Sequence, residues 1–126
     1  MSTQKKSMST QEVANRLVSL CREGKIIEAG EELYADNIVS NEPNSPMTKV
    51  AEGKKAVREK GNQFASMIEA QHGGRISDPI VAGEYFSTAW WMDVTMKGQG
   101  RVQMEEICTY RVQDGKIVWE QFLYSV

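Results

Sequence analysis

The chain has 126 residues, of which 40% are hydrophobic and 25% are charged, an ordinary composition for a globular protein. A chain of this length is expected to form one domain and to bury roughly two-thirds of the surface that its unfolded form exposes. The formal net charge of −2 argues against a surface that binds nucleic acid, and no stretch is apolar for long enough to cross a membrane.

The first residues and the cysteines bear on location and redox state. Residues 1–8 have no apolar run behind their lysines, so they do not form a signal peptide and are predicted to be a disordered tail before a domain at 9–126. Cys21 and Cys108 are far apart and lack the spacing of a metal site. We therefore expect reduced thiols in a cytoplasmic protein, with no metal and no cofactor.

Two helices are predicted at the start of the domain. Ser9 and Glu12 have the spacing of a capping box, and Gly24 suits the end of the first helix. The apolar residues of this helix repeat at helical spacing: Val13, Leu17, Leu20 and Cys21. A second helix is expected at about 25–34, with an apolar side of Ile26, Ile27, Ala29, Leu33 and Tyr34.

The middle of the chain predicts a short strand, a loop, a third helix and a further strand. The strand covers 37–42, and the loop at 43–51 is a candidate lid, whose apolar members Met47 and Val50 would fold over a pocket. Helical spacing then continues over 53–71. A strand at 75–82 is interrupted at Asp78 and Pro79, which suits a sheet edge.

The last third of the chain predicts three consecutive strands, at about 84–96, 101–112 and 116–124. Two loops compete for the last turn. A two-residue turn at Asp114 and Gly115 pairs Val112 with Ile117, whereas a three-residue loop at 113–115 pairs Val112 with Lys116. The choice matters because a slip of one residue moves every side chain to the other face.

We prefer the three-residue loop, because Gly115 suits its third position and because it gathers apolar side chains on one face. Cys108 then lies opposite Glu120, and Glu106 lies opposite Phe122. That face holds Met104, Tyr110, Val118, Phe122 and Tyr124.

The preceding strand extends the same face if residues 98–100 form its loop. Met92 then lies opposite Glu106 and Trp90 opposite Cys108. Glu106 thus lies between Met92 and Phe122, with Glu120 on the diagonal at roughly 7 Å between β-carbons. Two carboxyl groups among apolar neighbours do not both ionise freely, so one serves as an acid and the other as a base. Our hypothesis is that the pair shares a proton; in the alternative, both side chains reach water or pair with a cation.

The remaining side chains of this face suit a pocket for an apolar small molecule, and they suit a hydrophobic core equally. The predicted ligand-binding residues are Trp90, Met92, Met104, Cys108, Tyr110, Phe122 and Tyr124. The opposite face is too apolar to be left in water, which predicts a homodimer through that face. Its residues are Ala89, Trp91, Ile107, Thr109, Trp119, Gln121 and Leu123.

The order of elements predicts an α+β fold, with helices on one face of a mostly antiparallel sheet. Four segments in that order together resemble the nuclear transport factor 2-like superfamily, especially its SnoaL-like branch: 33–37, 41–43, 53–57 and 110–117. The resemblance covers nearly the whole chain from residue 9. It implies a cone-shaped α+β barrel, commonly dimeric, in a superfamily of polyketide cyclases, ketosteroid isomerase, dehydratases, epoxide hydrolases and non-catalytic modules.

The resemblance also implies roles for single residues. Glu42, just before a proline, occupies the place of the general base of ketosteroid isomerase. The two oxyanion-hole positions of that enzyme hold Leu17 and Cys108 here, which departs from the pattern needed for the steroid reaction.

We therefore expect a cytoplasmic dimer that binds an apolar or polycyclic small molecule. Glu42, Glu106 and Glu120 would transfer protons, as in an isomerase, cyclase, dehydratase or hydrolase. The alternative is a non-catalytic ligand carrier or dimerisation module of the same fold. A narrow pocket with Glu106 and Glu120 pointing inward favours chemistry, whereas a filled cone favours the module.

Overall fold

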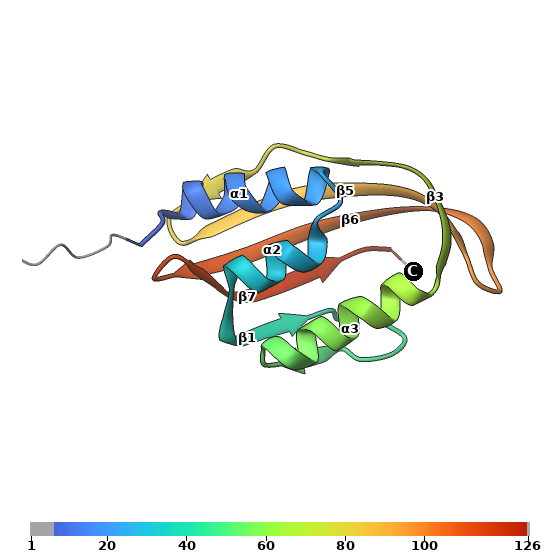
Figure 1. Ribbon diagram of the computed structural model, residues 1–126, viewed down its shortest axis with the longest axis horizontal. Coiled ribbons are helices and arrows are strands. Elements are labelled where there is room, and N and C mark those ends of the chain that lie inside the picture. The colour runs from blue at the N-terminus through green and yellow to red at the C-terminus, as the bar shows by residue number, and fades with distance from the viewer. Residues whose placement is uncertain (1–6, 126) are drawn as a thin grey trace, which may run out of the picture.

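A computed structural model describes residues 7–125 and arranges them as three helices on one face of a curved seven-stranded sheet that does not close (Figure 1). The strand order is β2-β1-β7-β6-β5-β3, with β4 paired to β5, and only β1 and β7 run parallel. The predicted α+β fold is confirmed. The elements are α1 (Thr10–Arg22), α2 (Ile26–Leu33), β1 (Tyr34–Asn41), β2 (Val50–Glu52), α3 (Lys54–Ser66), β3 (Ile68–Ile76), β4 (Ile80–Ala82), β5 (Tyr85–Met96), β6 (Gly100–Gln113) and β7 (Lys116–Leu123).

Helices α1 and α2 cover the inner face of the sheet. The capping box of α1 is confirmed, because Ser9 N–H donates to Glu12 Oε1 at 2.9 Å and Glu12 N–H donates to Ser9 Oγ at 3.1 Å. In α2, Ala29 and Leu33 are buried, but Ile26 and Ile27 are 55% and 59% exposed. The prediction that both isoleucines face the core was wrong, because this eight-residue helix turns only one narrow stripe to the sheet.

The segment after β1 forms a closed loop. Strand β2 was not predicted; it pairs with the end of β1, and Glu42 N–H donates to Lys49 C=O at 2.7 Å across the loop. Met47 and Val50 are 54% and 51% exposed, so they do not fold over a pocket as predicted for the lid.

Helix α3 is shorter than predicted and ends at Ser66 rather than near 71. Residues 68–76 instead pair along β5 as an edge strand, with a break at Asp78 and Pro79 before β4. The helical spacing of this segment is overridden by strand pairing with a distant part of the chain.

The turn between β6 and β7 has two residues, so the preferred three-residue loop was wrong. Val112 pairs with Ile117, and both Asp114 and Gly115 have positive φ, 51° and 75°, the signature of a type I′ turn. One residue later the register shifts, so that Val118 is an extra residue on β7.

This β-bulge restores the face that the wrong loop had predicted. Arg111 pairs with Trp119 and Tyr110 with Glu120, so the even-numbered residues of β6 and of β7 beyond the bulge again share one face. Glu120 therefore points inward, although the turn alone would have placed it on the outer face.

The register of β5 and β6 differs from the prediction by two residues. The shift changes which residues lie opposite each other but leaves each side chain on the predicted face of the sheet. The loop spans 97–99, and the first residue of β6 is Gly100. Thr88 therefore pairs with Cys108, and Trp90 with Glu106.

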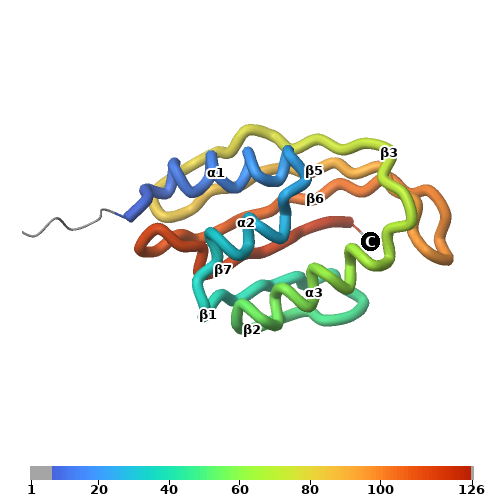
Figure 2. The backbone as a smooth tube through the Cα atoms, in the orientation of Figure 1, coloured from blue at the N-terminus to red at the C-terminus, as the bar shows by residue number. Residues whose placement is uncertain are grey.

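The described segments near the two ends of the chain lie at opposite ends of the molecule (Figure 2). The ends of β1, β7 and α3 gather at one end; the turn between β6 and β7 lies at the other. The hydrophobic core lies between the helices and the inner sheet face, and its largest fully buried apolar side chains are Phe86, Leu33, Ile38 and Ile117. No helix within residues 7–125 has the length and apolar character of a membrane span.

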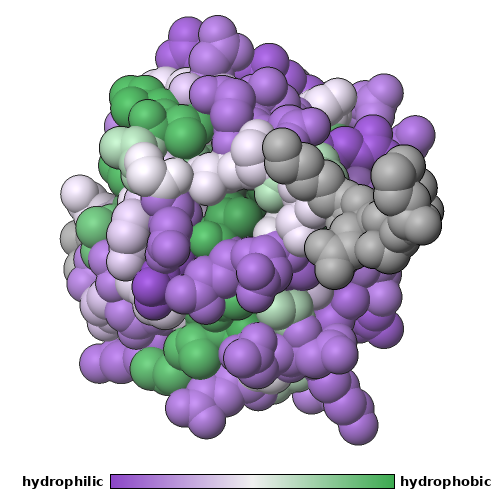
Figure 3. Space-filling model, turned by 90° about the vertical axis from the view of Figure 1, so that its left-hand side faces the viewer, coloured by the Kyte–Doolittle hydropathy of each residue, from purple (hydrophilic) through white to green (hydrophobic). Residues whose placement is uncertain are grey.

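The end that carries the β6–β7 turn is mostly hydrophilic, with small hydrophobic patches (Figure 3). An open groove of about 480 Å³ lies there, bordered by residues 7–10, Glu84 and 112–115. A second groove, of about 420 Å³, lies at Asp36, residues 53–55 and Arg58. Neither contains a predicted site residue. Of the predicted tail, Ser7 and Met8 lie beside Gly115, and residues 1–6 lie outside the described part.

Candidate functional site at the open end of the sheet

Glu120 is part of a buried hydrogen-bond network. It is 2% exposed, and its carboxylate accepts hydrogen bonds from the hydroxyl of Tyr34 and from Ser40 Oγ, the latter at 2.8 Å. Burial raises the pKa of Glu120, and the two hydrogen bonds oppose that shift. Burial and the charge of Glu120 in turn raise the pKa of Tyr34 well above its ordinary value. The network ties β1 to β7 and is satisfied without a ligand.

Glu106 is half-buried on β6 and lies opposite Trp90. It accepts one hydrogen bond, from Cys108 Sγ at 3.5 Å, and a thiol is a weak donor. Burial raises the pKa of Glu106; the Cys108 contact lowers it, the charge of Glu42 raises it, and the charge of Lys60 lowers it. Glu106 is thus a desolvated carboxyl group with little hydrogen-bonding support.

The predicted diagonal contact between Glu106 and Glu120 is wrong. Glu120 lies opposite Tyr110, four residues along β6 from Glu106, because the turn and the bulge set a register other than the predicted one. Each carboxyl group has its own partners, so the geometry removes the basis for a shared proton.

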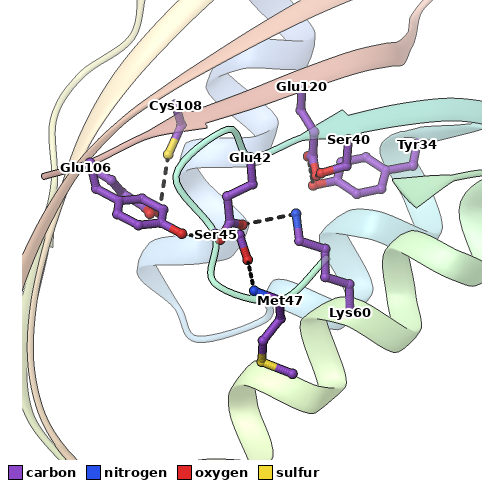
Figure 4. A network of polar contacts seen from close by, with 10 residues as sticks. Tyr34, Ser40, Glu42, Ser45, Met47, Lys60, Glu106, Cys108 and Glu120 are labelled. Carbon is purple, nitrogen blue, oxygen red and sulfur yellow. Dashed lines mark hydrogen bonds and ion pairs between the residues drawn. The ribbon is translucent and has the colours of Figure 1, made fainter. Parts of the chain in front are cut away.

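Glu106 is instead electrostatically coupled to an ion pair at the end of β1. Glu42 Oε1 lies 3.0 Å from Lys60 Nζ, and Tyr124 Oη donates to Glu42 Oε2 at 2.5 Å. The side chains of Lys60 and Glu42 are only 17% and 19% exposed. In the view of Figure 4, this pair lies between Glu106 and the group of Tyr34, Ser40 and Glu120.

We call this region the mouth. It consists of Glu42, Lys60, Trp90, Glu106, Phe122 and Tyr124. Sequence reasoning missed Lys60, although a signal was present. Lys60 falls three residues after Val57 and four before Phe64, on the stripe of α3 that faces inward. A lysine on the inward stripe of a helix is a polar group that needs a partner.

The predicted ligand-binding residues divide into two groups. Cys108 and Tyr110 are 1% and 2% exposed and belong to the core, where Tyr110 stacks on Phe86 with ring centroids 4.7 Å apart. Burial also raises the pKa of the Cys108 thiol, which suits an inert cysteine. The others are half-buried along the inner face and at the mouth: Trp90, Met92, Met104, Phe122 and Tyr124.

Among residues 7–125, no group of three or more histidine, cysteine, aspartate or glutamate side chains is placed to hold a metal ion. The side chains of the mouth themselves offer a carboxylate bound by an ammonium group, a desolvated carboxyl group and a phenol. Carboxyl groups in such different environments can act as an acid and a base.

Known proteins with this architecture were found in two ways. The family model of the SnoaL-like domain matches residues 8–124. A structure from Mesorhizobium loti, whose name assigns it to the SnoaL-like polyketide cyclases, is 36% identical with a TM-score of 0.88, over 93% of this chain and 100% of that one. No curated protein matches the sequence.

More distant structures share the fold. A ketosteroid isomerase-like protein of Catenulispora acidiphila, solved with trimethylamine, is 17% identical with a TM-score of 0.72, over 94% of this chain and 88% of that one. IdmH of Streptomyces antibioticus, whose name refers to polyketide cyclases, is 16% identical with a TM-score of 0.69, over 92% and 91%. With the family model matching nearly the whole chain, the protein belongs to the SnoaL-like family, within the nuclear transport factor 2-like superfamily.

Proposed function

We propose that the protein binds an apolar small molecule at the mouth and transfers a proton between carbon and oxygen of that molecule, as an isomerase or a cyclase does. The observation that carries this proposal is that two electrostatically coupled carboxyl groups have unlike surroundings. Glu106 is desolvated with a raised pKa, while Glu42 is ion-paired with Lys60. Half-buried Trp90 and Phe122 supply the apolar surface beside them.

The proposed step is enolisation of a ketone. Glu42 removes a proton from the carbon next to the carbonyl group, and the electron pair of that C–H bond forms the C=C bond of the enol. Glu106 gives its proton to the carbonyl oxygen. Lys60 and Tyr124 each occupy one oxygen of Glu42, and each oxygen has a second lone pair for the proton. Returning the proton on Glu42 to another carbon, while the enol O–H gives its proton back to Glu106, isomerises the ligand. Cyclisation follows instead if the enol carbon attacks a second carbonyl group: the enol O–H then returns its proton to Glu106, and the new alkoxide takes the proton held by Glu42.

Exchange of the α-protons of 2-tetralone, a bicyclic ketone, for deuterium in D₂O measures this step directly by NMR. We expect the protein to accelerate exchange above the buffer rate. Glu42→Gln and Glu106→Gln should each lower the accelerated rate about 100-fold, because general acid–base groups contribute at least that much.

The matched control is Glu59→Gln, because Glu59 is an exposed glutamate on α3, next to Lys60 in sequence. It should leave exchange unchanged. If 2-tetralone shifts the Trp90 indole resonance but does not exchange faster than in buffer, the enzymatic proposal is wrong. That result would favour the second candidate, a non-catalytic ligand carrier or dimerisation module of the same fold, and the filled core at Cys108 and Tyr110 supports the module.

We also propose that two copies pair through the outer face of β5, β6 and β7. Ile107, Leu123 and Tyr85 are 48%, 42% and 46% exposed there, which is a large apolar surface to leave in water. Light scattering at micromolar concentration should give the mass of a dimer, and Ile107→Lys should shift it toward the monomer. A wild-type monomer would contradict this proposal and leave the mouth unaffected.

A further inference from the structure

The ammonium group of Lys60 is the most unusual polar group at the mouth. Its Nζ atom is buried and has no hydrogen-bond partner among the described residues, although it lies 3.0 Å from Glu42 Oε1 as an ion pair. Its other neighbour is the ring of Phe122, with the centroid 5.6 Å away. An ammonium group has three N–H donors, so the single close contact with Glu42 Oε1 leaves hydrogen-bonding capacity for a further acceptor.

Glu120 and Ser40 show what a satisfied polar group looks like in this fold. There the carboxylate receives two hydrogen bonds from the neighbouring strand β1, one on each oxygen. Lys60 instead has one carboxylate within ion-pair distance, that of Glu42, and the ring of Phe122 on β7 nearby. Unused N–H donors on a largely buried ammonium group are costly, so the site favours a molecule that brings a further acceptor.

We propose that Lys60 binds an oxygen atom of the ligand that carries negative charge, either a carboxylate or an enolate. The inference rests on the proposed function in one respect, namely that the mouth binds a small molecule. It adds the class of ligand: an apolar ring system with an anionic oxygen. The flexible four-carbon side chain of Lys60 lets its ammonium group reach this oxygen, while the ring system of the ligand contacts Phe122 and Trp90.

Charge at the mouth is compatible with such a ligand. Lys60 offsets Glu42, and burial raises the pKa of Glu106, which favours its neutral form. The raised pKa of Tyr124, due to burial and to Glu42, keeps its hydroxyl neutral as well. The mouth is therefore close to neutral before the ligand enters, so an anionic oxygen at Lys60 does not face a net negative charge.

Binding of three naphthalene derivatives tests the proposal. 2-Naphthoate carries a carboxylate, 2-naphthamide has nearly the same shape without the charge, and 2-naphthol becomes an enolate-like anion when it loses its proton. Binding is followed by the NMR shift of the Trp90 indole. We expect wild-type protein to bind 2-naphthoate at least tenfold more tightly than 2-naphthamide, or to bind 2-naphthol as naphtholate, seen in its ultraviolet spectrum at pH 8. The first result identifies a carboxylate ligand and the second an enolate.

Variants separate the role of Lys60 from a general effect of charge. Lys60→Met should reduce the preference for 2-naphthoate over 2-naphthamide to less than about twofold and leave the affinity for 2-naphthamide unchanged. Lys60→Arg should retain most of that preference. Lys55→Met removes an exposed lysine from the same helix and should change nothing. If Lys60→Met does not fold, the ¹⁵N resonance of Lys60 Nζ in wild-type protein is the readout, and it should shift with 2-naphthoate and not with 2-naphthamide.

The outcomes keep the two proposals apart. If all three compounds bind at the mouth with equal affinity, or if Lys60→Met keeps the preference, the role of Lys60 is wrong and the mouth remains a binding site. If none of the compounds perturbs Trp90, binding at the mouth is contradicted, and the inference fails with it.

Discussion

Glu120 and Glu106 point to the same inner face of the sheet, yet their surroundings differ. Glu120 lies 2% exposed between two strands and accepts hydrogen bonds from Tyr34 and Ser40. Glu106 lies half-buried at the mouth with one thiol as its donor, near the ion pair of Glu42 and Lys60. Burial raises the pKa of both carboxyl groups, so a raised pKa alone does not distinguish a structural acid from a candidate catalytic one.

The hydrogen-bond partners make the distinction. A carboxyl group whose oxygens are occupied by neighbouring hydroxyl groups is committed to holding strands together, and a ligand would have to break that network. A carboxyl group that has mainly lost water, without gaining strong donors, is free to exchange a proton with a ligand. We therefore assign the deep network to stability, and the function that we propose requires the mouth.

Replacing each of the two glutamates by alanine should show the largest difference in the free energy of unfolding. Glu120→Ala leaves a cavity and two hydroxyl groups without their acceptor, which should lower the free energy of unfolding by about 3 kcal/mol or more. Glu106→Ala removes a half-buried side chain with one weak contact and should cost less than about 1 kcal/mol. Urea denaturation of both variants measures this, and equal losses would contradict the division.

The two tyrosines that donate to glutamates give a finer comparison. Tyr34→Phe removes a donor from the buried Glu120 and should cost about 1–3 kcal/mol. Tyr124→Phe removes a donor from Glu42, which keeps Lys60 and lies nearer to solvent, so the loss should be below about 1 kcal/mol. Thermal and urea unfolding of the two variants measure these losses. A larger loss for Tyr124→Phe than for Tyr34→Phe would contradict the assignment of Tyr34 to the stabilising network.

The first helix and the alternation of the last strands could be predicted because their signals are local. Ser9 and Glu12 form the capping box within one turn, and the side-chain period of a strand depends only on its own backbone. The bulge at Val118 has no such local signal. The loop predicted at 98–100 lies at 97–99 in the structure, where Gly100 is the first residue of β6. Pairing between strands sets both the bulge and the position of this loop. The predicted proximity of Glu106 and Glu120 was wrong because it depended on that pairing.

The inward faces survived these errors for a specific reason. The β5–β6 register was wrong by two residues, an even number, and in β7 the extra residue of the bulge compensated for the shorter turn. Which residues point inward was thus predictable, and which of them touch was not. Lys60 was missed because the inward stripe of α3 was defined by its apolar residues only.

The pH dependence of stability should separate the two carboxyl groups again. Burial raises both folded-state pKa values above the unfolded value of about 4.3, so the folded protein binds more protons than the unfolded chain above that pH. The stabilising contribution is complete below about pH 4.3 and is lost as pH rises through each folded-state pKa. A tenfold difference in proton affinity between the folded and unfolded states corresponds to about 1.4 kcal/mol of this contribution.

Glu120→Gln and Glu106→Gln should each flatten this decline above about pH 4.3, when the free energy of unfolding is compared with that of wild-type protein at each pH. We expect the smaller change for Glu106→Gln, because water reaches that side chain in part. A variant that declines as steeply as wild-type protein would show that its carboxyl group is ionised freely in the folded state.

The smallest expected effect concerns the thiol that donates to Glu106. Cys108→Ala removes this donor and should raise the pKa of Glu106 further, whereas Cys108→Ser replaces it with a stronger hydroxyl donor and should lower that pKa. Each variant should change the proton affinity of Glu106 by less than about tenfold, since a single neutral hydrogen bond contributes about 1 kcal/mol. Carboxyl ¹³C titration by NMR resolves these changes, with Glu120 as the internal control because its donors are unchanged. Changes of opposite sign in the two variants would show that the proton affinity of Glu106 follows its one donor, and equal changes would show that burial alone sets it.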